Sequence, residues 1–127
     1  MLRKIHHIAI IYSDYKKSKD FYVNKLGLEI INENYREERQ SFKLDLALVG
    51  EYVIELFSFP DPPTRTSYPE ACGLRHIAFE VDSIKETCKD LKSKGIDVEE
   101  IREDPVTGKL FTFFQDPDCL PIEIYEK

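Results

Sequence analysis

The chain contains two copies of one pattern of residues. His-Ile-Ala followed by an apolar residue occurs at residues 7–10 and again at residues 76–79, with an offset of 69 residues from His7 to His76. A glutamate between apolar residues occurs at residues 54–56 and again at 122–124, with an offset of 68 residues from Glu55 to Glu123. Two copies at this spacing indicate a duplicated module, because a solenoid needs more repeats to bury its core.

The pattern of apolar residues predicts the same order of elements in each copy. The expected strands are residues 4–12, 28–35, 41–49 and 52–57, and then residues 74–81, 98–102, 110–115 and 121–125. Ser13 or Asp14 is expected to cap a first helix that Gly27 ends. Ser83 opens a second helix with a Ser-x-x-Glu capping box, and Gly95 ends it. We therefore predict an α+β fold in which two βαβββ modules form a curved mixed sheet around a metal-binding cavity.

A proline-rich segment separates the two copies. Four prolines fall within residues 59–72, a density that excludes a helix or a central strand. We expect one domain over residues 1–127, with modules at about 4–58 and 73–127 joined by this linker. A chain of 127 residues suits one compact domain.

Composition excludes several classes of function. The chain has 18 Lys and Arg against 24 Asp and Glu, a net charge of −6, and no basic stripe for nucleic acid. No apolar run is long enough for a bilayer, and the first residues do not resemble a signal peptide. Three scattered cysteines, Cys72, Cys88 and Cys119, indicate reduced thiols. We therefore expect a cytoplasmic protein that binds neither nucleic acid nor membrane.

Four polar residues occupy matching places in the two copies. Because side chains alternate between the faces of a strand, His7 lies opposite its bulky neighbours, where the small Ala9 leaves room beside it. Glu55 is likewise on the face of its strand that points away from the helix. His76 and Glu123 hold the same places in the second copy. If a pseudo-twofold axis relates the modules, all four side chains face one concave surface.

Taken singly, each of the four residues has an ordinary explanation. A lone histidine in an apolar strand is usually a hydrogen-bonded core residue, and a lone glutamate can face solvent on a one-sided sheet. Matching positions in a repeat favour a shared role, and carboxylates are almost never buried unpaired. Two imidazoles and two carboxylates suit Ni²⁺, Co²⁺, Mn²⁺, Fe²⁺ or Zn²⁺, and leave two positions of an octahedral ion open. We predict that His7, Glu55, His76 and Glu123 are metal ligands.

Several segments resemble the vicinal-oxygen-chelate superfamily, which includes glyoxalase I, methylmalonyl-CoA epimerase, extradiol dioxygenases and fosfomycin-resistance enzymes. The segments that carry this resemblance are residues 6–10, 21–28, 53–56, 75–79 and 116–124. Residues 45–48, 55–60 and 75–76 are similar to the small bacterial YaeR-like glyoxalase-family proteins. The metal ligands of the superfamily fall on the same four residues. Glutamate at position 55 favours the glyoxalase set over the epimerase, and four protein ligands argue against the dioxygenases and fosfomycin enzymes.

The resemblance implies a metal-dependent enzyme of the lactoylglutathione-lyase type. Such an enzyme isomerises the hemithioacetal of a 2-oxoaldehyde and a thiol through an enediolate. Glu123 would be the base, with Glu55 as its symmetric alternative. The short chain resembles forms associated with nickel or cobalt, and a homodimer is common in the superfamily.

The sequence also departs from bacterial glyoxalase I. Ile11 and Phe59 stand where those enzymes have an arginine and an asparagine that hold glutathione, so the carrier thiol stays open. Cys119 replaces the usual glycine of the last turn, which is tolerable only if Cys119 avoids a positive φ. Lys43 and Asp45 either line the cavity or form an exposed pair on an edge strand.

Other functions and arrangements stay open at this point. The chain could act on another vicinal-oxygen substrate in an epimerase-like reaction. It could also bind a small molecule or antibiotic without catalysis, although such relatives generally lack the metal ligands. The sequence does not decide whether the two ligand pairs meet within one chain or across two chains of a dimer.

Overall fold

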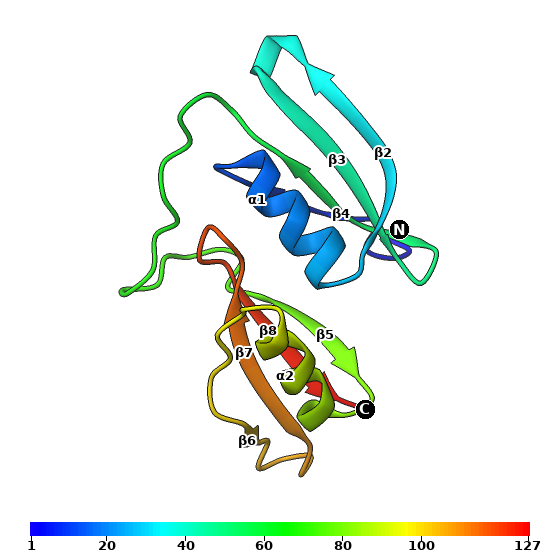
Figure 1. The fold of residues 1–127 in the computed structure, drawn as a ribbon, viewed down its shortest axis with the longest axis vertical. Helices are drawn as coiled ribbons and strands as arrows, with labels where there is room; N and C mark the ends of the chain where they lie inside the picture. The colour runs from blue at the N-terminus through cyan, green and yellow to red at the C-terminus, as the bar shows by residue number, and fades with distance from the viewer. The chain divides into compact units, whose positions relative to one another are not determined.

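The computed structural model describes residues 1–127, which divide into unit 1, Met1–Thr64, and unit 2, Arg65–Lys127 (Figure 1). Each unit holds one four-stranded mixed sheet and a helical segment that lies against it. No strand or helix lies between residues 57 and 77. The predicted α+β fold with two modules in one chain is confirmed.

Unit 1 has the strand order β1-β4-β3-β2. Its strands are β1 (Ile8–Ile11), β2 (Glu29–Arg36), β3 (Ser41–Leu48) and β4 (Glu51–Phe57). Its helical segments are α1 (Tyr15–Lys19), the π-helical η1 (Asp20–Lys25) and the 3₁₀ turn η2 (Glu37–Arg39). β1 runs parallel to β4, and the other neighbours are antiparallel.

Unit 2 repeats this plan with the order β5-β8-β7-β6. Its elements are β5 (Ile77–Val81), α2 (Ile84–Ser93), β6 (Arg102–Glu103), β7 (Leu110–Gln115) and β8 (Pro121–Glu126). β5 is parallel to β8, as β1 is to β4. Both pairs therefore set a module's first strand beside its last strand.

The strand predicted over residues 98–102 is wrong for most of its length. Only Arg102–Glu103 pairs with β7. The hydroxyl of Thr112 instead donates to the carbonyls of Glu99 and Glu100, at 2.9 and 3.0 Å. A side chain from β7 thus satisfies backbone groups that a ladder would otherwise have used.

The predicted helix boundaries are confirmed. Asp14 accepts a hydrogen bond from the backbone N–H of Lys17 at 3.1 Å, and Ser83 accepts one from Glu86 at 3.3 Å. Gly27 and Gly95 follow the two helical segments with φ of 82° and 81°. Both glycines thus adopt the left-handed conformation that commonly ends a helix. No helix of the chain is long and apolar enough to span a membrane.

The condition that Cys119 avoid a positive φ is not met, because its φ is 68°. The Asp116 carboxylate accepts hydrogen bonds from the backbone N–H groups of Asp118 and Leu120, at 2.8 and 2.9 Å. The backbone N–H of Cys119 donates to the Asp116 carbonyl at 3.0 Å. These bonds fix the turn between β7 and β8 in a shape that places Cys119 in the left-handed region.

Alternation along β4 and β8 determines which side chains are available for chemistry. Ile54 and Leu56 are buried, at 1% and 0% exposure, whereas Glu55 between them is only partly buried. In β8, Ile122 and Ile124 are buried around the partly exposed Glu123. Each glutamate therefore points to the face of its sheet opposite the apolar core, as the sequence predicted.

Candidate functional site

In unit 1 the structure brings His7 and Glu55 together. Glu55 pairs with Ala9 across the parallel ladder of β1 and β4. His7, two residues before Ala9, shares that face and lies just before β1. Its Nε2 lies 4.0 Å from Glu55 Oε2, and the two side chains are 35% and 18% exposed.

Unit 2 brings His76 and Glu123 together in the same way. Glu123 pairs with Ala78 in the parallel ladder of β5 and β8, and His76 lies just before β5. Nε2 of His76 is 2.9 Å from Glu123 Oε2. In each predicted pair, the histidine and the glutamate therefore lie close to each other within one unit.

The geometry of each pair fits a shared divalent cation. Nitrogen and oxygen ligands lie about 2.0–2.2 Å from such an ion, so two adjacent ligands of an octahedral site are about 3 Å apart. The His76–Glu123 distance of 2.9 Å matches this spacing. The His7–Glu55 distance of 4.0 Å is close to the spacing of about 4 Å for two ligands on opposite sides of the ion. Within neither unit do three His, Cys, Asp or Glu side chains form a group that could hold a metal ion. Each unit contains two of the four predicted ligands.

A charged network surrounds Glu55. Asp45 of β3 pairs directly opposite Glu55 of β4, and like charges opposite each other destabilise a sheet. The Lys43 ammonium offsets this repulsion, because its Nζ lies 3.3 Å from Asp45 Oδ2 and 3.4 Å from Glu55 Oε2. The alternative of an exposed edge-strand pair is wrong, because β3 lies between β4 and β2 and Asp45 is 9% exposed.

Tyr52 contacts both members of the His7–Glu55 pair. Its ring stacks on the His7 imidazole with centroids 5.0 Å apart and planes at 9°. Its hydroxyl donates to Asp45 Oδ1 at 2.8 Å, with Glu55 Oε2 at 3.5 Å as a second acceptor. Burial raises the pKa of Tyr52 well above its ordinary value, and the two carboxylates raise it further. The hydroxyl thus stays a proton donor.

Simple alternation does not predict Tyr52 at this site, because it places the side chain on the face opposite Glu55. The β3–β4 register shifts between Leu46 and Ala47, which pair with Ile54 and Tyr52. Val53 is therefore an extra residue on β4, a β-bulge that turns Tyr52 to the face of Glu55. A bulge of this kind leaves no clear signal in a single sequence.

The surroundings of the second pair are aromatic. Phe113 of β7 pairs directly opposite Glu123, and its ring meets the His76 imidazole edge-on with centroids 5.1 Å apart. The Arg102 guanidinium lies over the rings of Phe111 and Phe113, at 5.4 and 5.2 Å. Glu123 therefore pairs with an aromatic residue on the neighbouring strand, whereas Glu55 pairs with a second acidic residue.

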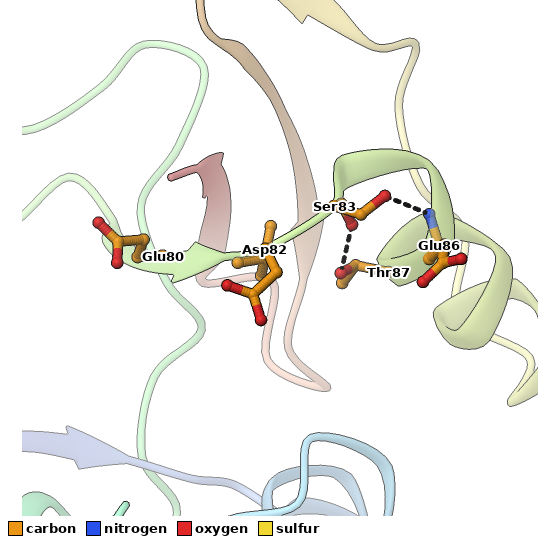
Figure 2. Close-up of a pocket in the computed structure, with 6 residues that line it drawn as sticks. Glu80, Asp82, Ser83, Glu86 and Thr87 are labelled. Carbon is orange, nitrogen blue, oxygen red and sulfur yellow. Dashed lines mark hydrogen bonds between the residues drawn. The ribbon is translucent and has the colours of Figure 1, made fainter.

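A separate hollow of about 410 Å³ opens at the start of α2 in unit 2 (Figure 2). It is lined by Glu80, Val81, Asp82, Ser83, Glu86 and Thr87, none of which belongs to a His–Glu pair. The Ser83 hydroxyl accepts from the Glu86 N–H, and the Thr87 hydroxyl donates to the Ser83 carbonyl. These bonds cap the helix. Because the hollow contains none of the four predicted ligands, we place the candidate site at the His–Glu pairs.

The sequence pattern of the Glyoxalase/Bleomycin resistance protein/Dioxygenase superfamily matches residues 4–124, and the chain belongs to this family. It is 65% identical to the protein YwkD of Bacillus subtilis over 127 residues, which covers 100% of this chain and 99% of that protein. It is 59% identical to YaeR of Escherichia coli over 126 residues, covering 99% and 98% of the two chains. The predicted resemblance to YaeR-like proteins is confirmed.

A solved structure and an enzyme extend the comparison. The glyoxalase family protein from Enterococcus faecalis superposes with a TM-score of 0.91 at 49% identity, covering 98% of each chain. Lactoylglutathione lyase of Escherichia coli O157:H7 is 32% identical over 133 residues, covering 98% of this chain and 93% of the enzyme. The superfamily includes many enzymes, and its members commonly bind divalent metals and small molecules.

Proposed function

We propose that this chain is a metal-dependent glyoxalase-like enzyme that isomerises the hemithioacetal of a 2-oxoaldehyde and a thiol. His7, Glu55, His76 and Glu123 would be the protein ligands of its divalent cation, with nickel or cobalt favoured over zinc, manganese or iron. The observation that carries the proposal is the duplicated His–Glu pair, set by the same parallel register in both units. The 32% identity to lactoylglutathione lyase supports the same reaction type.

Glu123 is the proposed base. When bound, the cation would act as a Lewis acid toward negative charge that develops on substrate oxygen. The Glu123 carboxylate would take a proton from the carbon beside the carbonyl and return it to the neighbouring carbon. Glu55 is restrained by Lys43 at 3.4 Å and by Tyr52 at 3.5 Å, whereas the close polar contact of Glu123 is His76. The less restrained carboxylate is better able to move between the two carbons.

The carrier thiol stays open, because the two positions that hold glutathione in bacterial glyoxalase I differ in this chain. Ile11 and Phe59, at the positions that hold glutathione in bacterial glyoxalase I, are 46% and 40% exposed. Neither side chain can form an ion pair or hydrogen bond with a peptide carboxylate. The same observation favours, as a second candidate, an epimerase-like reaction on another vicinal-oxygen substrate.

The proposal is tested on full-length protein purified without chelator. Elemental analysis identifies the bound metal, and protein loaded with Ni²⁺ or Co²⁺ is mixed with methylglyoxal and a panel of thiols that includes glutathione. Metal-dependent loss of the hemithioacetal with at least one thiol supports the proposal. Metal binding without turnover of any hemithioacetal would overturn the proposed glyoxalase reaction. An epimerase assay would then test the second candidate. Sedimentation with and without metal tests the expected homodimer.

A further inference from the structure

We propose that Tyr52 is a positioning residue that holds the His7–Glu55 pair in the geometry needed to bind a metal ion. The inference rests on the proposed function, since it assigns a role to a residue beside two of the proposed ligands. Tyr52 acts through both parts of its side chain. The ring supports the imidazole of His7, and the hydroxyl ties that ring to the carboxylates of β3 and β4.

His7 needs such support because it lies outside the sheet. It precedes β1, whose ladder with β4 starts at Ile8, and its side chain is 35% exposed. The Tyr52 ring stacks parallel to the imidazole and so restricts the plane of that ring. Nδ1 of His7 lies 2.8 Å from Nδ1 of His6, which leaves Nε2 directed toward Glu55. Ligating histidines are commonly oriented in this way through their second nitrogen.

The hydroxyl of Tyr52 fixes the position of its own ring. It donates to Asp45 Oδ1 at 2.8 Å, so a residue of β4 is tied to the neighbouring strand β3. Lys43 contacts the other oxygen of Asp45 and also Glu55. Tyr52, Asp45 and Lys43 therefore form one connected network that ends on the Glu55 carboxylate.

The backbone shows why this contact depends on local structure. The extra residue Val53 in β4 sets Tyr52 opposite Ala47, on the face that carries Asp45 and Glu55. Without the bulge, alternation would point Tyr52 into the apolar core beside Ile54. Unit 2 has Leu120 at the corresponding place, three residues before Glu123, and Leu120 is buried. Unit 2 therefore has no tyrosine at the place that Tyr52 occupies beside the His–Glu pair of unit 1.

Binding of Co²⁺ alone to full-length protein tests the inference. Titration calorimetry gives the Kd, and the visible absorption of bound Co²⁺ reports its coordination. Tyr52→Leu removes ring and hydroxyl and should raise the Kd by about 10–100-fold. Tyr52→Phe keeps the stacked ring and should raise it by a smaller factor, with a changed Co²⁺ spectrum. Tyr35→Phe removes a hydroxyl from an exposed tyrosine of the same unit and should leave both readouts unchanged.

The outcomes separate this inference from the proposed function. If the wild-type protein binds no Co²⁺, both fall. If the wild type binds Co²⁺ and a folded Tyr52→Leu variant has a Kd within about twofold of it, the proposed metal site stands and the role of Tyr52 is overturned. If Tyr52→Leu fails to fold, Tyr52→Phe decides, and an unchanged Kd and spectrum overturn the inference.

Discussion

The two units share a backbone plan but differ in what surrounds their His–Glu pairs. In each, a histidine just before the first strand lies near a glutamate of the last strand, and that glutamate pairs with an alanine. On the antiparallel side, Glu55 faces Asp45, whereas Glu123 faces Phe113. The two units thus share the candidate ligands and the register, whereas the residue paired with the glutamate on the third strand is acidic in unit 1 and aromatic in unit 2.

The comparison separates the feature that both units share from the features found in only one unit. A carboxylate opposite Glu55 costs stability through repulsion, and Lys43 and Tyr52 offset that cost. Phe113 has no charge, and the His76–Glu123 contact is shorter, at 2.9 Å against 4.0 Å. We infer that the pair is the shared requirement, and that neighbouring residues give unit 1 a more restrained carboxylate and unit 2 a freer one.

The largest expected effect concerns the two glutamates. Glu123→Gln removes the proposed base and should lower kcat by about 10²–10⁴-fold, and Glu55→Gln should lower it less. Steady-state kinetics on protein of measured metal content checks this, because glutamine can still act as a ligand. A larger loss for Glu55→Gln at equal metal content would assign the base to unit 1 instead.

Replacing the third-strand residues should affect stability unequally. Asp45→Leu leaves the Tyr52 hydroxyl without its 2.8 Å acceptor and should lower the free energy of unfolding by about 1–3 kcal/mol. Phe113→Leu loses an edge-on ring contact with His76 and should cost about 0.5–1.5 kcal/mol. Urea denaturation measures both. Equal losses would mean that the charged network adds nothing beyond packing.

The turn between β3 and β4 carries a strained residue. Val49 and Gly50 form a two-residue hairpin with φ of 49° and 77°, a conformation that favours Asn-Gly and penalises a β-branched side chain. Val49→Asn should raise the free energy of unfolding by about 1 kcal/mol. Val106→Asn is the control, because Val106 is also 90% exposed but is not among the residues with positive φ. No gain at Val49, or an equal gain at Val106, would refute the strain.

The corresponding turn of unit 2 should give the smallest effect. Cys119 has φ of 68°, and glycine removes the clash of its Cβ but also adds freedom to the unfolded chain. Cys119→Gly should therefore raise the free energy of unfolding by about 0.5 kcal/mol. Thermal unfolding beside Cys72→Gly, at an exposed cysteine without positive φ, checks it. A lower Tm for Cys119→Gly alone would show that the thiol contributes to the turn.

The local sequence determined the faces of the strands and the ends of the helices. Period-two alternation placed Glu55 and Glu123 opposite the apolar core, and side-chain caps with glycine stops bounded the helices. These features follow from residues close together in the chain, because strand alternation and helix capping act over a few residues. The repeat then predicted that each histidine would lie near a glutamate, and in both units the two side chains are close.

The positions of Tyr52 and Asp45 beside Glu55 depend on pairing between strands. Alternation predicts faces only while a ladder is unbroken, and the bulge at Val53, which is defined by the partner strand β3, moved Tyr52 beside His7 and Glu55. Asp45 became an internal neighbour of Glu55 because β3 lies between β4 and β2. The candidate ligands thus follow from the sequence pattern. The residues that surround them depend on the tertiary structure, because strand register is set by contacts between segments far apart in the chain.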